Sequence, residues 1–176
     1  IPLELSTNER KESLKLPYDN KEIERLLLSP HFSNRNRRFK QPQNFWVPLL
    51  GLFEGMRIDE ICQLYKEDIK KVGGVWCIDI NIDKDKKTKN MASIRIVPIH
   101  PVLIDLGFLD YVKSFNHGRI FPQLKNNPNK GQGYSHDFNK NINKYLKRWV
   151  NDTTKKSFHS TRRSFATNLK QQGVHN

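Results

Sequence analysis

The feature that most restricts the fold is an apolar run over residues 45–53, Phe-Trp-Val-Pro-Leu-Leu-Gly-Leu-Phe. The run is too short to cross a bilayer as a helix, which requires about 20 residues. A helix that is apolar on every side has to be buried, and we expect Pro48 near its start. The chain must therefore build a core around this segment, which Gly55 ends.

Helical periodicity predicts the elements that cover this segment. Asp19 is a candidate N-cap, and Glu22 three residues later completes the signature of a capping box. Phe138, Ile142 and Trp149 share one face of a strongly amphipathic stretch. The predicted helices cover residues 21–28, 58–64, 101–115 with an interruption near Gly107, 135–150 and 159–172, and residues 31–44 are expected to form a basic loop.

Alternating side chains in the middle of the chain predict a small sheet. Trp76, Ile78 and Ile80 alternate along one strand, and Gly73-Gly74 predicts a turn before it. Strands over 66–71, 76–82 and 93–99 would form an antiparallel meander. We therefore predict an α+β fold, a mainly α-helical domain with a small three-stranded antiparallel sheet. The 176 residues are expected to form one domain over 17–176, with residues 1–16 as a lead-in.

The net charge narrows the choice of partner. The chain has 31 Lys and Arg against 18 Asp and Glu, a formal charge of +13. Such an excess favours nucleic acid first and an anionic membrane surface second. The sequence has no basic amphipathic helix with a broad apolar face, so no membrane partner is expected. Cys62 and Cys77 lack metal-ligand spacing and are consistent with a reducing cytoplasm.

Three groups of residues are of the types that bind a phosphate or transfer a proton to it. The first group is centred on Arg57. Arg57 lies between Gly55 and an apolar helix, where a guanidinium requires an anion. That anion is either the carboxylate of Asp59 or Glu60, or a bound phosphate, whose oxygens a guanidinium binds two at a time.

The second group opens the last predicted helix. His159 and Arg162 are three residues apart and share one face, at a helix N-terminus that itself favours an anion. The alternative is a capping histidine beside a solvated arginine. Phe165, Ala166 and Leu169 are expected to face inward from the same helix.

The third group is a loop over residues 84–89 with lysines at positions 84, 86, 87 and 89. Taken alone, it is typical of a solvated hairpin tip. A lysine on a mobile loop can also reach a leaving oxygen and act as a general acid.

Together these groups resemble the motifs of a known family. Residues 55–61, Gly-Met-Arg-Ile-Asp-Glu-Ile, are similar to the first arginine motif of the tyrosine recombinases, the phage integrase family. Lys-Thr-Lys at 87–89 and Arg-Ile-Val-Pro-Ile-His-Pro at 95–101 resemble the family's β-hairpin lysine and the strand after it. His-Ser-Thr-Arg at 159–162 resembles its His-x-x-Arg helix. The likeness extends over residues 16–174, and the motifs occur in the family's order.

The resemblance implies a role for each matching residue. Arg57 and Arg162 would hold the non-bridging oxygens of the scissile phosphate. His159 would hydrogen-bond the same phosphate or assist proton transfer. Lys87 would protonate the leaving 5′ oxygen, with Lys89 as the alternative.

The resemblance also implies a nucleophile and a supporting residue. Glu60 would orient Arg57 from behind. In the family a tyrosine hydroxyl attacks the phosphate and forms a 3′-phosphotyrosyl link that conserves bond energy, so no ATP, metal or other cofactor is needed. All five tyrosines precede His159, and we nominate none of them as the nucleophile. We expect an excised catalytic domain that is truncated at its C-terminus, without the tyrosine segment and without an N-terminal DNA-binding domain.

Further basic residues are expected to contact the DNA backbone without reading its sequence. Lys140, Lys144 and Lys147 form one stripe at helical spacing, and such a stripe repels itself unless phosphates neutralise it. Arg163 stands where the family usually has histidine. The full set of expected backbone contacts is Arg35, Arg37, Arg38, Lys89, Arg95, Lys140, Lys144, Lys147 and Arg163.

The sequence therefore predicts part of a site-specific DNA recombinase of phage or prophage type in a bacterial or phage cytoplasm. The full-length protein would act as a tetramer on attachment-type sites in duplex DNA, and the fragment alone would be inactive. One alternative is a DNA-binding module without catalysis, such as a decayed prophage integrase. The other is a metal-dependent nuclease or transposase, which needs clustered carboxylates. Asp79, Asp83 and Asp85, on a strand and a charged turn, match that requirement poorly.

Overall fold

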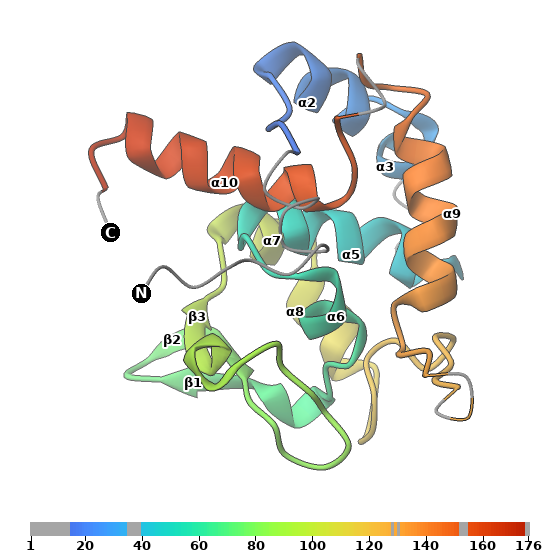
Figure 1. Ribbon diagram of the computed structural model, residues 1–176. Helices are drawn as coiled ribbons and strands as arrows, with labels where there is room; N and C mark the ends of the chain where they lie inside the picture. The colour runs from blue at the N-terminus through green and yellow to red at the C-terminus, as the bar shows by residue number, and fades with distance from the viewer. Residues whose placement is uncertain (1–14, 35–39, 128, 130, 152–154, 175–176) are drawn as a thin grey trace, which may run out of the picture.

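The computed structural model describes residues 15–34, 40–127, 129, 131–151 and 155–174. Figure 1 shows helices on several sides of one central helix, with a small sheet at one edge. The predicted α+β class is confirmed. The elements are α2 (Asn20–Leu27), α3 (Pro30–Ser33), α5 (Pro42–Phe53), α6 (Ile58–Cys62), the 3₁₀ helix η1 (Lys66–Asp68), β1 (Ile69–Val72), β2 (Val75–Ile80), the 3₁₀ helix η2 (Met91–Ser93), β3 (Arg95–Pro98), α7 (Pro101–Asp105), α8 (Phe108–Lys113), α9 (His136–Leu146) and α10 (His159–Gln171).

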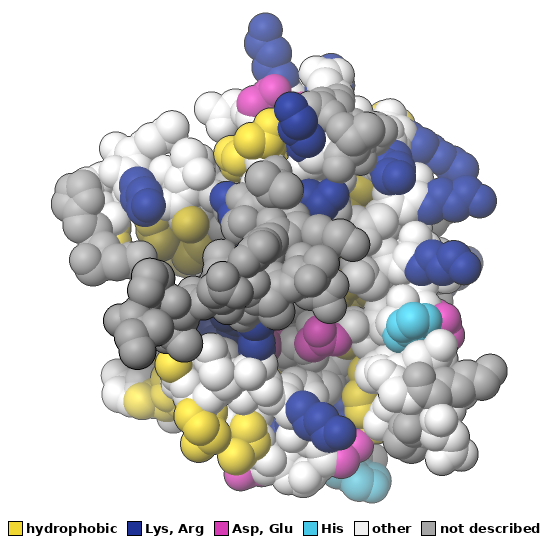
Figure 2. Space-filling view, in the orientation of Figure 1, with side chains coloured by type: hydrophobic (Ala, Val, Ile, Leu, Met, Phe, Trp, Pro, Cys, Tyr) yellow, Lys and Arg dark blue, Asp and Glu magenta, His cyan; other side chains and the backbone are white. Residues whose placement is uncertain are grey.

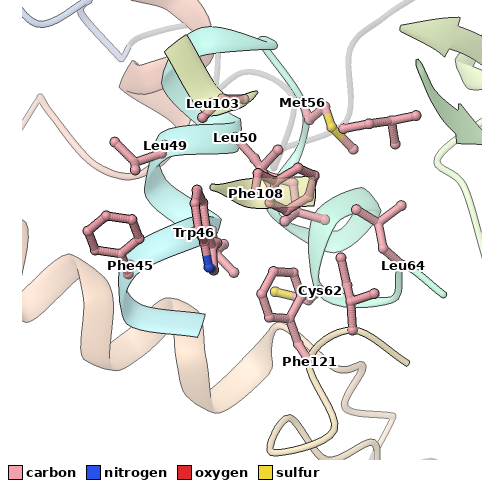
Figure 3. Packing of buried hydrophobic residues seen from close by; sticks show 14 of the residues in the cluster. Phe45, Trp46, Leu49, Leu50, Met56, Cys62, Leu64, Leu103, Phe108 and Phe121 are labelled. Atoms are coloured by element: carbon pink, nitrogen blue, oxygen red, sulfur yellow. The ribbon is translucent and has the colours of Figure 1, made fainter. Parts of the chain in front are cut away.

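Helix α5 is the buried helix that the apolar run predicts. Trp46 and Leu50 have no exposed surface. The ring of Trp46 lies 5.2 Å from that of Phe108 and 5.9 Å from that of Tyr111, both on α8. Figure 3 shows Trp46 and Phe108 among the buried side chains of the core. The apolar run therefore fixes the middle of the molecule, and the elements that carry polar chemistry are arranged around it.

Two details at the start of α5 differ from the prediction. The helix begins at Pro42, so Pro48 lies inside it rather than near its start. Pro42 is well placed in the first turn, where a missing N–H costs no helical hydrogen bond. The expected basic loop over 31–44 is also interrupted, because residues 30–33 form the short helix α3.

The small sheet is the predicted antiparallel meander, in the order β1-β2-β3. Ile69 pairs with Ile78, and Cys77 pairs with Pro98. The first strand begins later than predicted, at Ile69, because residues 66–68 form η1. The carboxylate of Asp68 accepts a hydrogen bond from the backbone N–H of Tyr65 at 2.8 Å, which stabilises this tighter turn.

The other predicted helices are present, with α2 shifted by one residue and the others ending earlier than predicted. Helix α2 begins at the expected capping box, where the Asp19 carboxylate accepts from the Glu22 N–H at 2.8 Å and the Glu22 carboxylate accepts from the Asp19 N–H at 2.9 Å. Gly107, at a φ of 88°, separates α7 from α8. Helix α9 ends at Leu146, before the predicted end at residue 150.

Helix α10 packs on α5 through a face that hydrophobicity did not predict. Ser160, Thr161 and Ser164 are buried, whereas Ala166 is exposed and Phe165 and Leu169 are half-buried. The expectation that Ala166 faces inward is therefore wrong.

Two glycines explain why this interface is built from small residues. A Cβ at Gly51 would lie 2.6 Å from Oγ1 of Thr161, and one at Gly55 would lie 2.9 Å from Cε1 of Phe165. The backbone of α5 and of the turn after it thus approaches α10 more closely than a side chain would permit. This close approach brings the segment that carries Arg57 against the helix that carries Arg162.

The residues before α2 are tied to the same helix. The backbone N–H of Tyr18 donates to the Ser164 hydroxyl at 2.8 Å, and that hydroxyl lies 3.2 Å from the Tyr18 carbonyl oxygen. The Tyr18 phenol donates to the carbonyl oxygen of Ser157 at 2.6 Å. Tyr18 is therefore a structural anchor of α10.

Candidate active site

One cavity of about 820 Å³ contains all four side chains to which the sequence assigns chemistry. Arg57 enters it from the start of α6, and Lys87 from the loop between β2 and β3. His159 and Arg162 enter from the first turn of α10. Segments up to about 105 residues apart in the chain therefore meet around one space.

Arg57 is the residue at which the chain turns into α6. Its backbone is extended, and its own N–H donates to the Glu60 carboxylate at 2.9 Å. The guanidinium donates to Oε1 of Glu60 at 2.7 Å and to the hydroxyl of Ser93 at 3.0 Å. Of the two carboxylates that the sequence left open as its partner, Glu60 is the one it contacts, while Asp59 accepts from the hydroxyl of Ser135.

The Glu60 carboxylate also accepts hydrogen bonds from a second arginine. Arg95, the first residue of β3, donates to its two oxygens at 3.2 and 3.0 Å. The Glu60 side chain is only 2% exposed. Burial alone would raise the pKa of Glu60, but the hydrogen bonds from Arg95 and Arg57 outweigh that effect and hold the pKa below its usual value. Glu60 therefore stays ionised and fixes the direction of both guanidinium groups.

Among the described residues, Arg162 makes no such contact with a carboxylate. Its guanidinium donates to the backbone carbonyl of Gly55, at the turn that Arg57 follows. Burial, and next the positive charges of Arg57 and Arg95, lower the pKa of Arg162 from its usual value. Because guanidinium remains charged in proteins, Arg162 contributes a cation whose neighbours are mainly cations.

His159 is the first residue of α10, half-buried at the cavity wall. The N–H of Phe158, just before it, donates to the side-chain oxygen of Asn143 on α9 at 2.6 Å. Asn143 also donates to the side chain of Asn139 at 2.7 Å, and both asparagines line the cavity. The position of His159 is thus set jointly by α9 and α10.

Neighbouring lysines of the loop have different surroundings. Lys86 is buried and forms an ion pair with Asp68, so its charge is used within the fold. Lys84 pairs with Glu67 at 3.2 Å. Lys87 and Lys89 are exposed and line the cavity. The Lys87 ammonium has no hydrogen bond or ion pair with another described residue.

The cavity carries an excess of positive charge. Among the described residues that line it are the cations of Lys15, Arg57, Lys87, Lys89 and Arg162, against the carboxylates of Asp59 and Glu60. Both carboxylates are already engaged by protein groups. A bound anion would relieve this imbalance, and the uncapped N-terminus of α10 lies at the same wall.

The residues expected to contact the DNA backbone have varied positions. Lys140 and Lys144 are exposed on α9 and Lys147 is exposed just after its end. Figure 2 shows Lys and Arg side chains recurring along the side of the molecule where Figure 1 draws this helix. Arg163 is half-buried. Arg35, Arg37 and Arg38 lie outside the described residues.

The five tyrosine hydroxyls all have protein partners. Tyr18, Tyr111 and Tyr145 donate to Ser157, Ile120 and Ser29, respectively, and Tyr65 and Tyr134 donate to Asp85. Of these tyrosines, Tyr134 lines the cavity. Burial, and then the hydrogen bond to Asp85, raise its pKa, so its phenol is harder to ionise than usual.

The model of the phage integrase family matches residues 20–176, most of the chain. The chain belongs to the phage integrase family. Among solved structures, the Tn1549 transposon integrase (residues 82–397) in complex with circular intermediate DNA has a similar fold, with a TM-score of 0.50 and 16% identity. The match covers 99% of the present chain and 56% of that integrase chain. A search of curated proteins finds no match.

The sequence did not identify every notable residue of this integrase-family site. Arg95 was expected to contact the DNA backbone, and its ion pair with Glu60 was not predicted. Gln63 was not singled out, although it lies three residues after Glu60 and lines the cavity. Among the described residues, no helix is long and apolar enough to span a bilayer. In the same part of the chain, no group of three or more His, Cys, Asp or Glu side chains is placed to hold a metal ion.

Proposed function

We propose that this chain is the phosphate-binding part of a site-specific DNA recombinase that integrates phage-type DNA by transesterification. The observation that carries the proposal is the convergence of Arg57, Lys87, His159 and Arg162 on one cavity with excess positive charge. Family membership supports the same reaction class. In this proposal residues 17–176 are part of a catalytic domain whose other segments belong to a longer protein.

The proposed roles follow from the contacts of each side chain. Arg57, held by Glu60, and Arg162, held by the Gly55 carbonyl, bind the non-bridging oxygens of the scissile phosphate. As the attacking oxygen bonds to phosphorus, negative charge grows on these oxygens, and preorganised donors lower the barrier. His159 donates to the same phosphate from the N-terminus of α10.

The leaving group needs a proton, and Lys87 is the proposed donor. A tyrosine hydroxyl from another part of the full-length protein gives up its proton to a water molecule and forms the new bond to phosphorus, while the bond from phosphorus to the 5′ oxygen breaks. The proton moves from the ammonium of Lys87 to that 5′ oxygen. The 3′-phosphotyrosyl link keeps the energy of the broken bond, so the reverse reaction rejoins DNA without ATP or metal. Lys89, on the same wall, remains the alternative donor.

The test is to trap the covalent intermediate. The full-length protein is mixed with a duplex that carries a nick close to the scissile phosphate, in the presence of a metal chelator. We expect a covalent protein–DNA adduct on denaturing gels, because the short fragment beyond the nick diffuses away and religation stops. Tight DNA binding without any adduct would instead identify a DNA-binding module, and an adduct that requires added metal would contradict the mechanism.

Lys140 and Lys144 on α9, and Lys147 just after it, are proposed to contact the phosphate backbone of the duplex. Replacing all three by alanine is expected to weaken binding and to reduce the log–log salt slope by roughly 0.9 for each lysine that neutralises a phosphate. The matched control replaces three lysines that lie outside the cavity lining, Lys70, Lys71 and Lys113, and so makes the same change in net charge. Equal slopes for the two triple variants would refute a contact by α9.

The wider setting is also proposed from the family. The full-length protein is expected to assemble as a tetramer on attachment-type sites in duplex DNA. We place its action in the cytoplasm of a bacterium, where the buried thiols of Cys62 and Cys77 stay reduced.

A further inference from the structure

The loop that carries Lys87 is fastened to the body of the protein beside the cavity. A general acid contributes only when its proton lies within hydrogen-bond reach of the leaving atom. A lysine side chain has four flexible methylene groups, so the main chain that bears it has to be fixed for the ammonium to be placed reproducibly. The structure provides such a fixed point in Gln63.

Gln63 follows the last turn of α6 and is 7% exposed. Its side-chain oxygen accepts from the backbone N–H of Lys87 at 2.8 Å, and its side-chain nitrogen donates to the carbonyl oxygen of Lys87 at 2.5 Å. Both main-chain polar groups of one loop residue are therefore bound by one amide side chain. The pair imitates the exchange of hydrogen bonds between two antiparallel strands.

The two residues before Lys87 are fastened as well. Lys86 is buried against Asp68. Asp85 accepts from the hydroxyls of Tyr65 and Tyr134, both at 2.7 Å, and from Arg119 at 2.6 Å. These contacts fix the main chain at Asp85 and Lys86, and Gln63 fixes the main chain at Lys87, whose side chain enters the cavity.

Arg119 connects the contacts of Asp85 with those of Gln63. Its guanidinium lies 3.6 Å from the ring centre of Tyr134 and also donates to the backbone carbonyl of Gln63 at 2.8 Å. The loop and the end of α6 thus form one hydrogen-bonded unit, and Arg57 and Glu60 begin that same helix.

We propose that Gln63 is a positioning residue that holds the main chain of Lys87 so that its ammonium reaches the leaving 5′ oxygen. The inference rests on the proposed function of Lys87 as the proton donor. Helix α6 then places two parts of the reaction at once. Its first turn orients Arg57 on the phosphate, and Gln63, the residue just after its end, sets the proton donor one helix length away.

The test compares two leaving groups in the full-length protein. One substrate is a nicked duplex with the natural 5′ oxygen at the scissile bond, and the other has sulfur in that bridging position. A thiol has a pKa of about 8.5, far below that of an alcohol, so sulfur departs without a proton donor. A variant that has lost only the proton transfer is therefore slow on oxygen and normal on sulfur.

Gln63→Met keeps the length of the side chain and removes both hydrogen bonds to Lys87. We expect it to slow single-turnover cleavage of the oxygen substrate about 10²-fold, the effect of a misplacement near 1 Å. Cleavage of the sulfur substrate should stay within about twofold of the unmodified protein, which is the signature of lost general acid catalysis. Equal slowing on both substrates, or no slowing on either, would overturn the proposal.

Three further variants complete the design. Lys87→Ala must show the same preference for sulfur, and if it does not, the proposed function of Lys87 fails rather than the role of Gln63. Gln63→Glu keeps the acceptor for the Lys87 N–H and loses the donor, so it tests the same contact should the methionine variant not fold. It should give the same selective loss on oxygen. Gln123→Ala, at an exposed glutamine outside the cavity lining, should cleave both substrates at the unmodified rate.

Discussion

Replacement of Arg162 by alanine in the full-length protein is expected to slow formation of the covalent adduct about 10²- to 10³-fold, the usual cost of removing one donor to a developing oxyanion. The loss should appear in the rate of the chemical step, measured in single-turnover trapping with saturating protein. Duplex binding should weaken by less than about tenfold, because Arg162 is one of several cations that line the cavity. The large effect on rate and the small effect on affinity together identify a group that acts mainly in the transition state.

Arg162→Lys separates charge from geometry at the same position. Lysine keeps the positive charge but cannot bind two phosphate oxygens in the plane of a guanidinium. It also loses the hydrogen bond by which the Gly55 carbonyl holds the side chain. Its rate should fall between those of the unmodified protein and the alanine variant. The control is Arg25→Ala, at an exposed arginine of α2. An Arg162→Ala protein that forms adduct at the unmodified rate would refute the assignment.

Replacement of Gly55 by alanine is expected to destabilise the fold by about 2–5 kcal/mol. Two costs combine at this position. Its φ of 61° is in the left-handed region, which costs a residue with a Cβ about 1–2 kcal/mol. The added carbon would also press into the ring of Phe165, and crowding of a packed interface costs about 1–3 kcal/mol. The free energy of unfolding from urea titrations measures the sum.

Alanine substitutions at two other glycines measure the backbone cost and the crowding cost separately. Gly73→Ala has a similar φ of 55° with no atom within 4 Å of the new Cβ, so it should show only the backbone cost. Gly51 has no positive φ, and its Cβ would lie 2.7 Å from the Phe158 ring, so Gly51→Ala should show only the crowding. A Gly55→Ala protein no less stable than Gly73→Ala would contradict the close approach of α10 to this turn.

Much of the fold could be predicted because its strongest signals are local. The apolar run predicts α5, the Asp19–Glu22 pair predicts the start of α2, and Gly107 predicts the break between α7 and α8. The inward face of α10 could not be predicted in this way. A buried face is normally apolar, but here the partner surface is glycine, so serine and threonine fit where larger residues would not.

In the candidate site too, local motifs could be predicted from the sequence and tertiary contacts could not. Motif spacing singled out Arg57, His159 and Arg162, and the cavity brings them together. Spacing alone does not distinguish one lysine of a charged loop from the next. Only the tertiary contact of Lys86 with Asp68 shows that this lysine is not available as the proton donor. Gln63 was missed for a related reason, because a side chain that binds the backbone of a residue distant in the chain leaves no pattern in the sequence.

The hydrogen bonds between Tyr18 and Ser164 have a mechanical consequence. Both backbone polar groups of Tyr18 meet one hydroxyl on α10, two residues after Arg162. The segment before α2 is therefore hydrogen-bonded directly to the helix whose first turn carries Arg162. A displacement of the chain at Tyr18 is expected to act on that helix through a single hydroxyl group.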